Sequence, residues 1–218
     1  MMLSVVLGEL DQGKEGADVA LPAFTNFGGS LLANFLNTVR MESSHVQDLL
    51  DTPTDVERWC AFMVRTGWLS GEQYQRLQRA PLLLSPLQQF RSTSRNFLAN
   101  HSDPSSLGLW LTEQLASRPL TFQIQNEERA GWTCMPLPEE GGTDGIITLL
   151  AYDWMRLGGS KKLDRLKRCE NLNCLAYFIN ESGRRKWCSM EGCGNRQKSR
   201  RHYRRLHKSG EGEGRPPV

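Results

Sequence analysis

Four cysteines in the C-terminal third of the chain have the residue type and the spacing of a metal site. Cys169 and Cys174 form one C-x4-C pair, and Cys188 and Cys193 form a second pair after thirteen intervening residues. Thiolate is a preferred ligand of Zn²⁺, which takes four ligands in a tetrahedron, and two short turns can supply all four without a large core around them. The spacing therefore predicts one structural zinc ion, with two disulfides as the alternative.

The N-terminal sequence argues against export, and therefore against the disulfides. Residues 1–18 have no basic n-region, and the apolar stretch from Leu3 to Leu7 is too short for the core of a signal peptide. Because thiols stay reduced in the cytosol and no apolar run reaches the length of a membrane helix, we expect a cytoplasmic protein that contacts no membrane. The other two cysteines, Cys60 and Cys134, have apolar neighbours, and we expect both to be small buried hydrophobes.

Charge divides the chain into an acidic and a basic part. Residues 1–155 carry 10 Lys+Arg against 18 Asp+Glu, a net charge of −8, whereas residues 156–208 carry 16 against 4, a net charge of +12. The chain is long enough to bury one real core, but the basic segment alone is not. We therefore predict a mobile extension over residues 1–22, a mainly helical domain over 23–158, a zinc module over 161–208 and a disordered tail over 209–218.

Apolar spacing and capping residues predict the helices of the first domain. A first helix follows Ser30, and its apolar spacing continues to Val39. Further helices are expected where a capping residue precedes apolar spacing. These starts are Thr52 before Pro53, Ser70 with Gln73, Ser85 with Gln88, and Asp103 before Pro104. The stretch from Ile146 to Leu157 is so apolar that it predicts a central buried helix.

The apolar period changes from helical to alternating between residues 120 and 137. Leu120, Phe122 and Ile124 alternate with polar residues, and Trp132 and Cys134 do so after a polar turn, which predicts a β-hairpin. The fold class that we expect is α+β. It combines a mainly helical N-terminal domain that carries a β-hairpin with a small C-terminal four-cysteine zinc-binding module that ends in a basic helix.

That basic helix is expected directly after the last cysteine. Gly194 allows the positive φ that a tight turn can require, and Asn195 is a good N-cap. At about 100° per residue, the cations of this helix share one arc of about 200°, and the opposite sector is expected to pack beside Trp187 and Phe178. That sector holds Ser199, His202, Tyr203 and Leu206. The cations are Arg196, Lys198, Arg200, Arg201, Arg204, Arg205 and Lys208.

A continuous cationic surface of this kind predicts a nucleic-acid partner. Each Lys or Arg that neutralises a phosphate releases a condensed counterion, and Arg can also bond guanine in the major groove. Arg184, Arg185 and Lys186 add three cations on the turn between the cysteine pairs. DNA is the partner that we expect, and RNA stacked on Trp187 and Tyr177 is the alternative. A solvated basic surface, or docking on an acidic protein such as the chain's own first domain, also stays open.

The stretch from Trp187 to Arg196 reads WCSMEGCGNR and leads into the basic run. It resembles the CGNR zinc finger, a family named for its last four residues. The stretches Asn34–Val39 and Asp48–Trp59 are similar to the ABATE domain, described as a stress-induced transcription regulator. The resemblance implies a bacterial DNA-binding regulator whose zinc ligands are the four cysteines. This chain has Asn180 where the family often carries Asp.

No catalytic constellation is present in the sequence. There is no Gly-rich phosphate loop, HExxH pair or nucleophile elbow, and four thiolates would close the coordination shell of zinc, so we expect no enzyme. If the first domain senses a small-molecule effector, Asn37, Thr38 and Arg40 at the end of the first helix are the candidate pocket. Helix termination and local hydrogen bonding are the simpler explanation of these residues. A homodimer is a further arrangement compatible with such a regulator.

Overall fold

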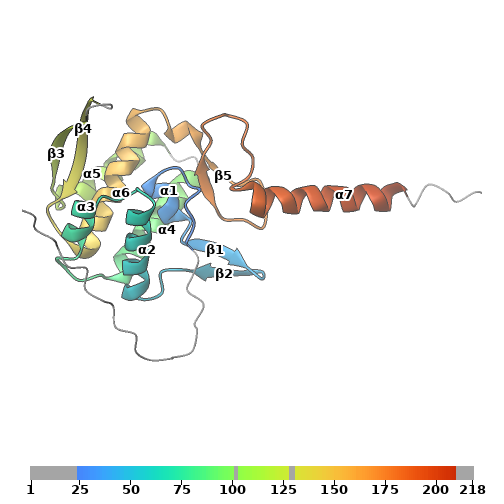
Figure 1. Cartoon of the computed structure of the whole chain (residues 1–218), viewed down its shortest axis with the longest axis horizontal. Coiled ribbons are helices and arrows are strands. Elements are labelled where there is room, and N and C mark those ends of the chain that lie inside the picture. Colours follow the sequence, from blue (N-terminus) through green and yellow to red (C-terminus); the bar gives the residue numbers. More distant parts are fainter. Residues whose placement is uncertain (1–23, 101–102, 128–130, 210–218) are drawn as a thin grey trace, which may run out of the picture.

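The computed structural model describes residues 24–100, 103–127 and 131–209, and Figure 1 shows their arrangement. The extension predicted over residues 1–22 and nearly all of the predicted tail lie outside these ranges. The helices are α1 (Leu31–Leu36), α2 (Pro53–Arg65), α3 (Gly71–Leu77), α4 (Leu84–Asn100), α5 (Pro104–Ala116), α6 (Gly142–Gly159) and α7 (Asn195–Ser209). The strands are β1 (Val39–Glu42), β2 (His45–Asp48), β3 (Leu120–Glu127), β4 (Gly131–Pro138), β5 (Leu166–Arg168) and β6 (Tyr177–Ile179). Two short turns are η1 (Leu163–Arg165, a 3₁₀ helix) and η2 (Met190–Gly194, a π-helix).

The core is built around α6, as its apolar sequence predicted. This helix packs against α1, α3, α4 and α5, and its side chains Leu150 and Trp154 are almost completely buried. Phe35 from α1 and Trp59 from α2 meet edge to face in the same core, with ring centroids 5.4 Å apart. Among the described helices, none is both long enough and apolar enough to cross a membrane.

The predicted capping residues start three of the four helices for which they were proposed. The confirmed caps are Thr52 with Asp55, Ser70 with Gln73, and Asp103. The prediction for Ser85 with Gln88 is wrong, because α4 already begins at Leu84. A tertiary contact lies at this helix start instead. The hydroxyl of Thr143 accepts a hydrogen bond from the amide of Leu83 at 2.6 Å and donates one to the carbonyl of Leu83 at 3.1 Å.

The first helix ends earlier than its apolar spacing predicted. Asn37 is its C-cap, and Val39 begins a short hairpin in which β1 pairs antiparallel with β2, with Val39 opposite Asp48. The turn of this hairpin passes through Ser43 and Ser44, both with positive φ (45° and 74°). Helical spacing over so few residues cannot distinguish a last helical turn from a strand start, so the hairpin was missed.

The second hairpin is confirmed, but its exposed face was not predicted. β3 pairs antiparallel with β4, with Ile124 opposite Cys134. Ile124 and Trp132 are 65% and 75% exposed, and Cys134 is exposed on the same face, so the prediction of a buried Cys134 is wrong. Period-two alternation identifies the two faces of a strand but does not say which of them the core covers. Cys60 is buried as predicted, and burial, with a smaller contribution from Glu57, raises its pKa to about 12.

The short strands of the basic segment pack directly on the helical core. β5 and β6 form an antiparallel pair, and Leu166, Tyr177 and Ile179 belong to the same buried cluster as α1 and α6. The amide of Ile179 donates to the carbonyl of Gly28 at 2.7 Å. Gly29 has φ +81°, and a Cβ there would lie 3.1 Å from that of Ile179, so this approach needs glycine. The boundary predicted between the two domains stays a prediction, but the interface across it is packed.

Candidate metal centre and its basic helix

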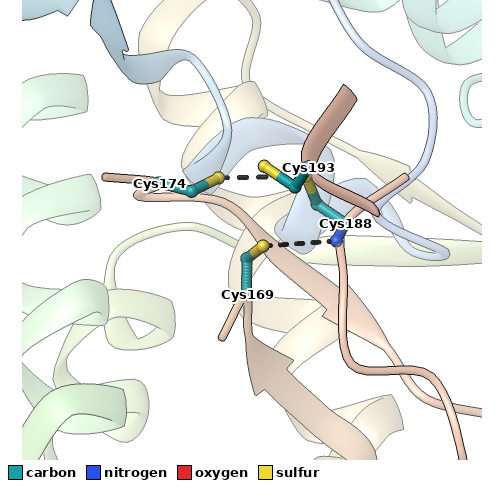
Figure 2. Close-up of side chains that lie close together, drawn as sticks. All are labelled: Cys169, Cys174, Cys188 and Cys193. Atoms are coloured by element: carbon teal, nitrogen blue, oxygen red, sulfur yellow. Dashed lines mark hydrogen bonds between the residues drawn. The ribbon is translucent and has the colours of Figure 1, made fainter. Parts of the chain in front are cut away.

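The four predicted zinc ligands converge from separate segments of the C-terminal region (Figure 2). Cys169 directly follows β5, and its amide donates to the carbonyl of Ala176 at 2.9 Å. Cys174 closes a tight turn, in which its backbone amide donates to the carbonyl of Asn171 at 2.9 Å. Cys188 follows the basic loop that contains Arg184, Arg185 and Lys186, and Cys193 lies in η2. The two C-x4-C pairs therefore form one cluster, as their spacing predicted.

The distances between the sulfurs fit a closed tetrahedral site. All four Sγ atoms lie within 4.8 Å of one another, and those of Cys174 and Cys188 are 3.8 Å apart. A Zn–S distance of about 2.3 Å implies an edge of about 3.8 Å between sulfurs of a tetrahedron. All four cysteines are free thiols, which excludes the alternative of two disulfides in this structure. The donor set thus fits one structural zinc ion with no position left for a substrate.

Hydrogen-bond donors surround these sulfurs. Cys193 Sγ accepts from Asn171 Nδ2 at 3.3 Å and from Arg196 Nη2 at 3.4 Å, and Cys169 Sγ accepts from the amide of Cys188 at 3.4 Å. A zinc ion with four thiolates carries a net charge of about −2, which such donors and the nearby guanidinium stabilise. Neither Asn171 nor the sulfur contact of Arg196 was predicted. The position of Asn171 between Cys169 and Cys174 in the sequence could have indicated its contact with the sulfurs.

The pKa values of the clustered thiols indicate why several thiolates at this site need a bound metal ion. Hydrogen bonds from Cys174 and Cys188 lower the pKa of Cys169 to about 2, and the same interaction raises the pKa of Cys174 to about 11. The pKa of Cys188 is also raised, first by its hydrogen bond with Cys169. One thiolate is stabilised by its neighbours' protons, and further thiolates beside it need a positive charge. Zinc binding must release these protons, so zinc affinity falls as pH is lowered.

The basic loop before Cys188 is held by Asn180 and Arg185. Asn180 donates from Nδ2 to the carbonyl of Arg185 at 3.0 Å and accepts from its amide at 3.1 Å, a pair of bonds that an Asp side chain could not make in full. The Arg185 guanidinium lies 4.3 Å from the ring centroid of Phe178. It donates to the carbonyls of Phe27 (3.2 Å), Trp187 (3.0 Å) and Cys188. Arg185 is therefore a structural clamp within the module.

The junction between the zinc site and α7 differs from the prediction. The expected N-cap, Asn195, already has helical dihedrals, and Ser189 caps the preceding π-helical turn by accepting from the amide of Gly192 at 3.0 Å. Gly194 does not have the positive φ that was predicted. A Cβ there would lie 2.7 Å from Sδ of Met190, whose flexible and half-exposed side chain would have to move aside. The metal-binding turn thus continues into α7 without a break, which couples the direction of the helix to Cys193.

The helix α7 projects away from the body of the protein (Figure 1). Its exposed cations include Lys198, Arg200 and Arg201. The expected packing of its less charged sector on the module is wrong where the structure describes it, since Tyr203 is 62% exposed and His202 is exposed as well. The side chains of Arg204, Arg205, Leu206 and Lys208 lie outside the described part of the structure.

The other predicted nucleic-acid contacts fall on the loop beside β5. Arg184 and Lys186 are exposed, and together with Lys167 and Arg168 they line an open concavity of about 610 Å³. Lys186 Nζ lies 3.8 Å from a carboxylate oxygen of Glu170 in the same surface. Lys167 and Arg168 were not among the predicted contacts, although their position next to Cys169 could have suggested them. The nucleic-acid contacts predicted for Arg184, Arg185 and Lys186 stay predictions.

The residues proposed as an effector pocket have structural partners. Asn37 donates from Nδ2 to the carbonyl of Tyr177 at 2.9 Å and accepts from its amide at 2.7 Å. Thr38 accepts a hydrogen bond from the buried guanidinium of Arg91 at 2.6 Å. Asn37 and Arg40 line a cavity of about 200 Å³ beside the thiols, whereas Thr38 does not. The hydrogen-bonding explanation accounts for Asn37 and Thr38, with partners much farther along the chain than expected.

Two arginines of α4 connect the body to this region and were missed. Arg91 forms a buried ion pair with Asp48. Arg95 donates to the carbonyls of Leu36 at 2.8 Å and Leu175 at 3.0 Å, and its guanidinium lies 5.0 Å from the ring centroid of Tyr177. The sequence could have indicated a structural role for both, because they are two cations one turn apart in a helix that carries no acidic residue.

The fold and the sulfur cluster together define a four-cysteine zinc-binding module attached to a helical body. Residues 165–206 match the family model of the CGNR zinc finger. This match contains all four cysteines, the basic loop and most of α7, and it confirms the first part of the resemblance. It covers less than half of the chain, and the similarity of the preceding residues to the ABATE domain stays a prediction. No curated protein matches the chain.

Proposed function

We propose that this protein binds nucleic acid in a zinc-dependent manner and regulates transcription by presenting α7 to duplex DNA. The observation that carries the proposal is an exposed cationic helix that continues directly from the turn of a zinc ligand, Cys193, and stands clear of the acidic body. Zinc would fix the origin and direction of this helix. A rigid cationic helix can enter a major groove or follow a phosphate backbone.

Each part of the basic surface has a distinct task in this proposal. Lys198, Arg200 and Arg201 are exposed on α7 and are available to phosphates and base edges. Arg184 and Lys186 extend the cationic surface beside the helix and would contact the neighbouring backbone. In this proposal Arg185 supports the module itself, because its guanidinium donates to backbone carbonyls inside it.

The alternatives have less support from the described residues. The two rings expected to stack on RNA are poorly placed for it, because Tyr177 is 4% exposed and Trp187 is partly buried, which leaves Tyr203 of α7 as the exposed ring beside the cations. Docking of the helix on the acidic body would hide its cations, whereas α7 points away from that body. Duplex DNA is therefore the partner that we propose.

Fluorescence anisotropy of the zinc-loaded full chain on mixed duplex fragments over a salt series tests this function. The double variant Arg200→Ala/Arg201→Ala is expected to reduce the slope of log affinity against log salt by up to about 1.8, since each phosphate contact contributes about 0.9. The matched control is Arg58→Ala/Arg79→Ala, which removes the same charge from exposed positions on the body and should leave the slope unchanged.

Three outcomes would contradict the proposal. One is tighter binding to single-stranded RNA of matched length at equal salt. Another is an equal loss of slope in both double variants, which would indicate that only net charge matters. The third is the absence of any binding at low salt, which would direct the search to a protein partner of the basic face.

A further inference from the structure

A cavity of about 490 Å³ lies where the helical body meets the zinc module. Phe97 of α4, Leu107 of α5 and Trp154 of α6 line it from the body, and β5 and Tyr177 of β6 line it from the module. Its volume falls within the range of about 300–1,000 Å³ that is typical of small-molecule sites. The cavity is separate from the thiol cluster and from α7.

Most of the cavity wall is apolar. Besides Phe97, Leu107 and Trp154, it includes Leu163 of η1 and Leu166 of β5. Trp154 and Leu166 are 1% and 7% exposed, so they form a fixed part of the core and not a mobile surface. Such a wall gives favourable free energy to an apolar ligand body that leaves water.

The polar side chains at the rim of this cavity are mostly positively charged. Lys167 and Arg168 line it and are exposed, and neither forms an ion pair within the described part of the structure. Tyr177 is 4% exposed, and its hydrogen bonds with Asn37 are made by its backbone, so no described partner occupies its hydroxyl. A phenolic hydroxyl that lines a cavity without a protein partner can donate to a ligand acceptor there. Asp164 is the one acid in the lining, so the rim has a net charge of about +1.

The electrostatics of the neighbouring Arg95 agree with an anion at this position. Burial lowers the pKa of Arg95 most; Tyr177 and Cys174 raise it, and the positive charges of Arg168 and Arg91 lower it further. The guanidinium of Arg95 is therefore repelled by those of Arg168 and Arg91, and it lies against the ring of Tyr177. A bound anion would relieve this repulsion, whereas a bound cation would increase it.

We propose that this junction cavity binds a small amphipathic monocarboxylate, whose aromatic or aliphatic body contacts Phe97 and Leu107 and whose carboxylate contacts Arg168, Lys167 and the Tyr177 hydroxyl. One negative charge matches the net charge of the rim, and Asp164 opposes a second one. The apolar wall excludes small inorganic anions as good ligands, because they would leave it unfilled. The proposal does not depend on nucleic-acid binding.

Occupancy of the cavity would couple the body to the metal centre. Arg168 directly precedes the zinc ligand Cys169, and Tyr177 is held to α1 by both hydrogen bonds of Asn37. A ligand that contacts both sides binds only while β5 and β6 are docked on the body, so it stabilises that docked state by mass action. By reciprocity, loss of zinc that loosens this strand pair must weaken the ligand.

Isothermal titration of the zinc-loaded full chain with 2-naphthylacetate and with the neutral 2-(2-naphthyl)ethanol tests the site. We expect the acid to bind at least tenfold more tightly than the alcohol. Arg168→Gln should remove most of that preference while leaving the affinity for the alcohol unchanged. Arg79→Gln, an exposed cation on the body, is the matched control and should change neither affinity.

Two further variants locate the site. Leu107→Trp fills the cavity and should abolish binding of both compounds, and Tyr177→Phe keeps the ring but should weaken only the acid several-fold. Circular dichroism and zinc content verify that each variant is folded. If Leu107→Trp does not fold, Arg168→Gln and Tyr177→Phe decide the matter. Equal binding of acid and alcohol, unchanged binding in a folded Leu107→Trp, or no binding at millimolar probe overturns the proposal.

Discussion

The helical body and the zinc module are stabilised by different means. The body has a continuous apolar core around Leu150 and Trp154 and helices that begin at side-chain caps. The module has a much smaller cluster, in which Phe178 and Ala176 accompany the cysteines themselves. Small domains of this size cannot bury enough apolar surface to fold alone, so metal and hydrogen bonds replace the missing core.

The comparison also shows that the module is not self-contained. Its strand pair places Tyr177 and Ile179 in the core of the body, and Asn37 of the body supplies hydrogen bonds to β6 as a neighbouring strand would. The module is therefore stabilised from two sides: by zinc at the loops and by the body at the strands. The predictions below separate these two contributions.

Removal of zinc should have the largest effect. Structural zinc contributes on the order of 10–16 kcal/mol apparent in small fingers, so chelation should unfold the loops from Cys169 to Cys193 and release the base of α7. Amide NMR spectra are expected to lose dispersion for this segment while α2 to α6 keep theirs. Cys188→Ser should reproduce the effect, whereas Cys134→Ser, at an exposed thiol, should not. Unchanged spectra after complete chelation would contradict a structural role for the metal.

Removal of the Asn37 bridge, the pair of hydrogen bonds from Asn37 of the body to Tyr177 of β6, should have the next largest effect. Asn37→Ala leaves the buried amide and carbonyl of Tyr177 without partners, which should lower the free energy of unfolding by about 2–4 kcal/mol. Urea unfolding followed by tryptophan fluorescence measures it. The control Asn96→Ala, at an exposed position of α4, should change stability by less than about 0.5 kcal/mol. Equal effects of the two variants would show that the bridge contributes nothing.

The Arg185 clamp distinguishes structural from surface cations within the module. Arg185→Gln loses hydrogen bonds to the loop carbonyls and the contact with Phe178, and we expect zinc affinity to fall by about 10–100-fold. Arg184→Gln removes the same charge one residue earlier from an exposed side chain and should leave zinc affinity nearly unchanged. Competition with a chromophoric chelator measures both variants. A similar loss in the two would mean that charge, and not the clamp, supports the metal.

A helix cap in the body should have the smallest effect. Thr52→Ala removes the side-chain oxygen that accepts from the amide of Asp55 at 3.2 Å, and this should lower stability by about 1 kcal/mol without changing zinc affinity. Thr54→Ala, an exposed residue in the first turn of α2, serves as the control and should be close to neutral. A change in zinc affinity in the capping variant would contradict the division between the two regions.

Features that depend on neighbouring residues were predictable from the sequence. The zinc ligands share two short turns, and the caps at Thr52 and Ser70 act within three residues, so residue type and spacing contain the necessary information. The failures also share a cause. The helix start near Ser85, the strand that begins at Val39 and the exposure of Cys134 all depend on which distant segments pack nearby. Local periodicity does not contain that information.

The sequence by itself determined the metal, its four ligands, the helical character of the body and the cationic run after Cys193, because these follow from side-chain chemistry and local spacing. Only the tertiary structure decided that Asn37 reaches Tyr177, 140 residues away, and that Arg185 donates to carbonyls within the module and to that of Phe27. It also decided that a cavity lies at the junction, with Lys167 and Arg168 at its rim. Such contacts arise when segments far apart in the chain bury a common surface, and their partners are set by the packing of the whole core.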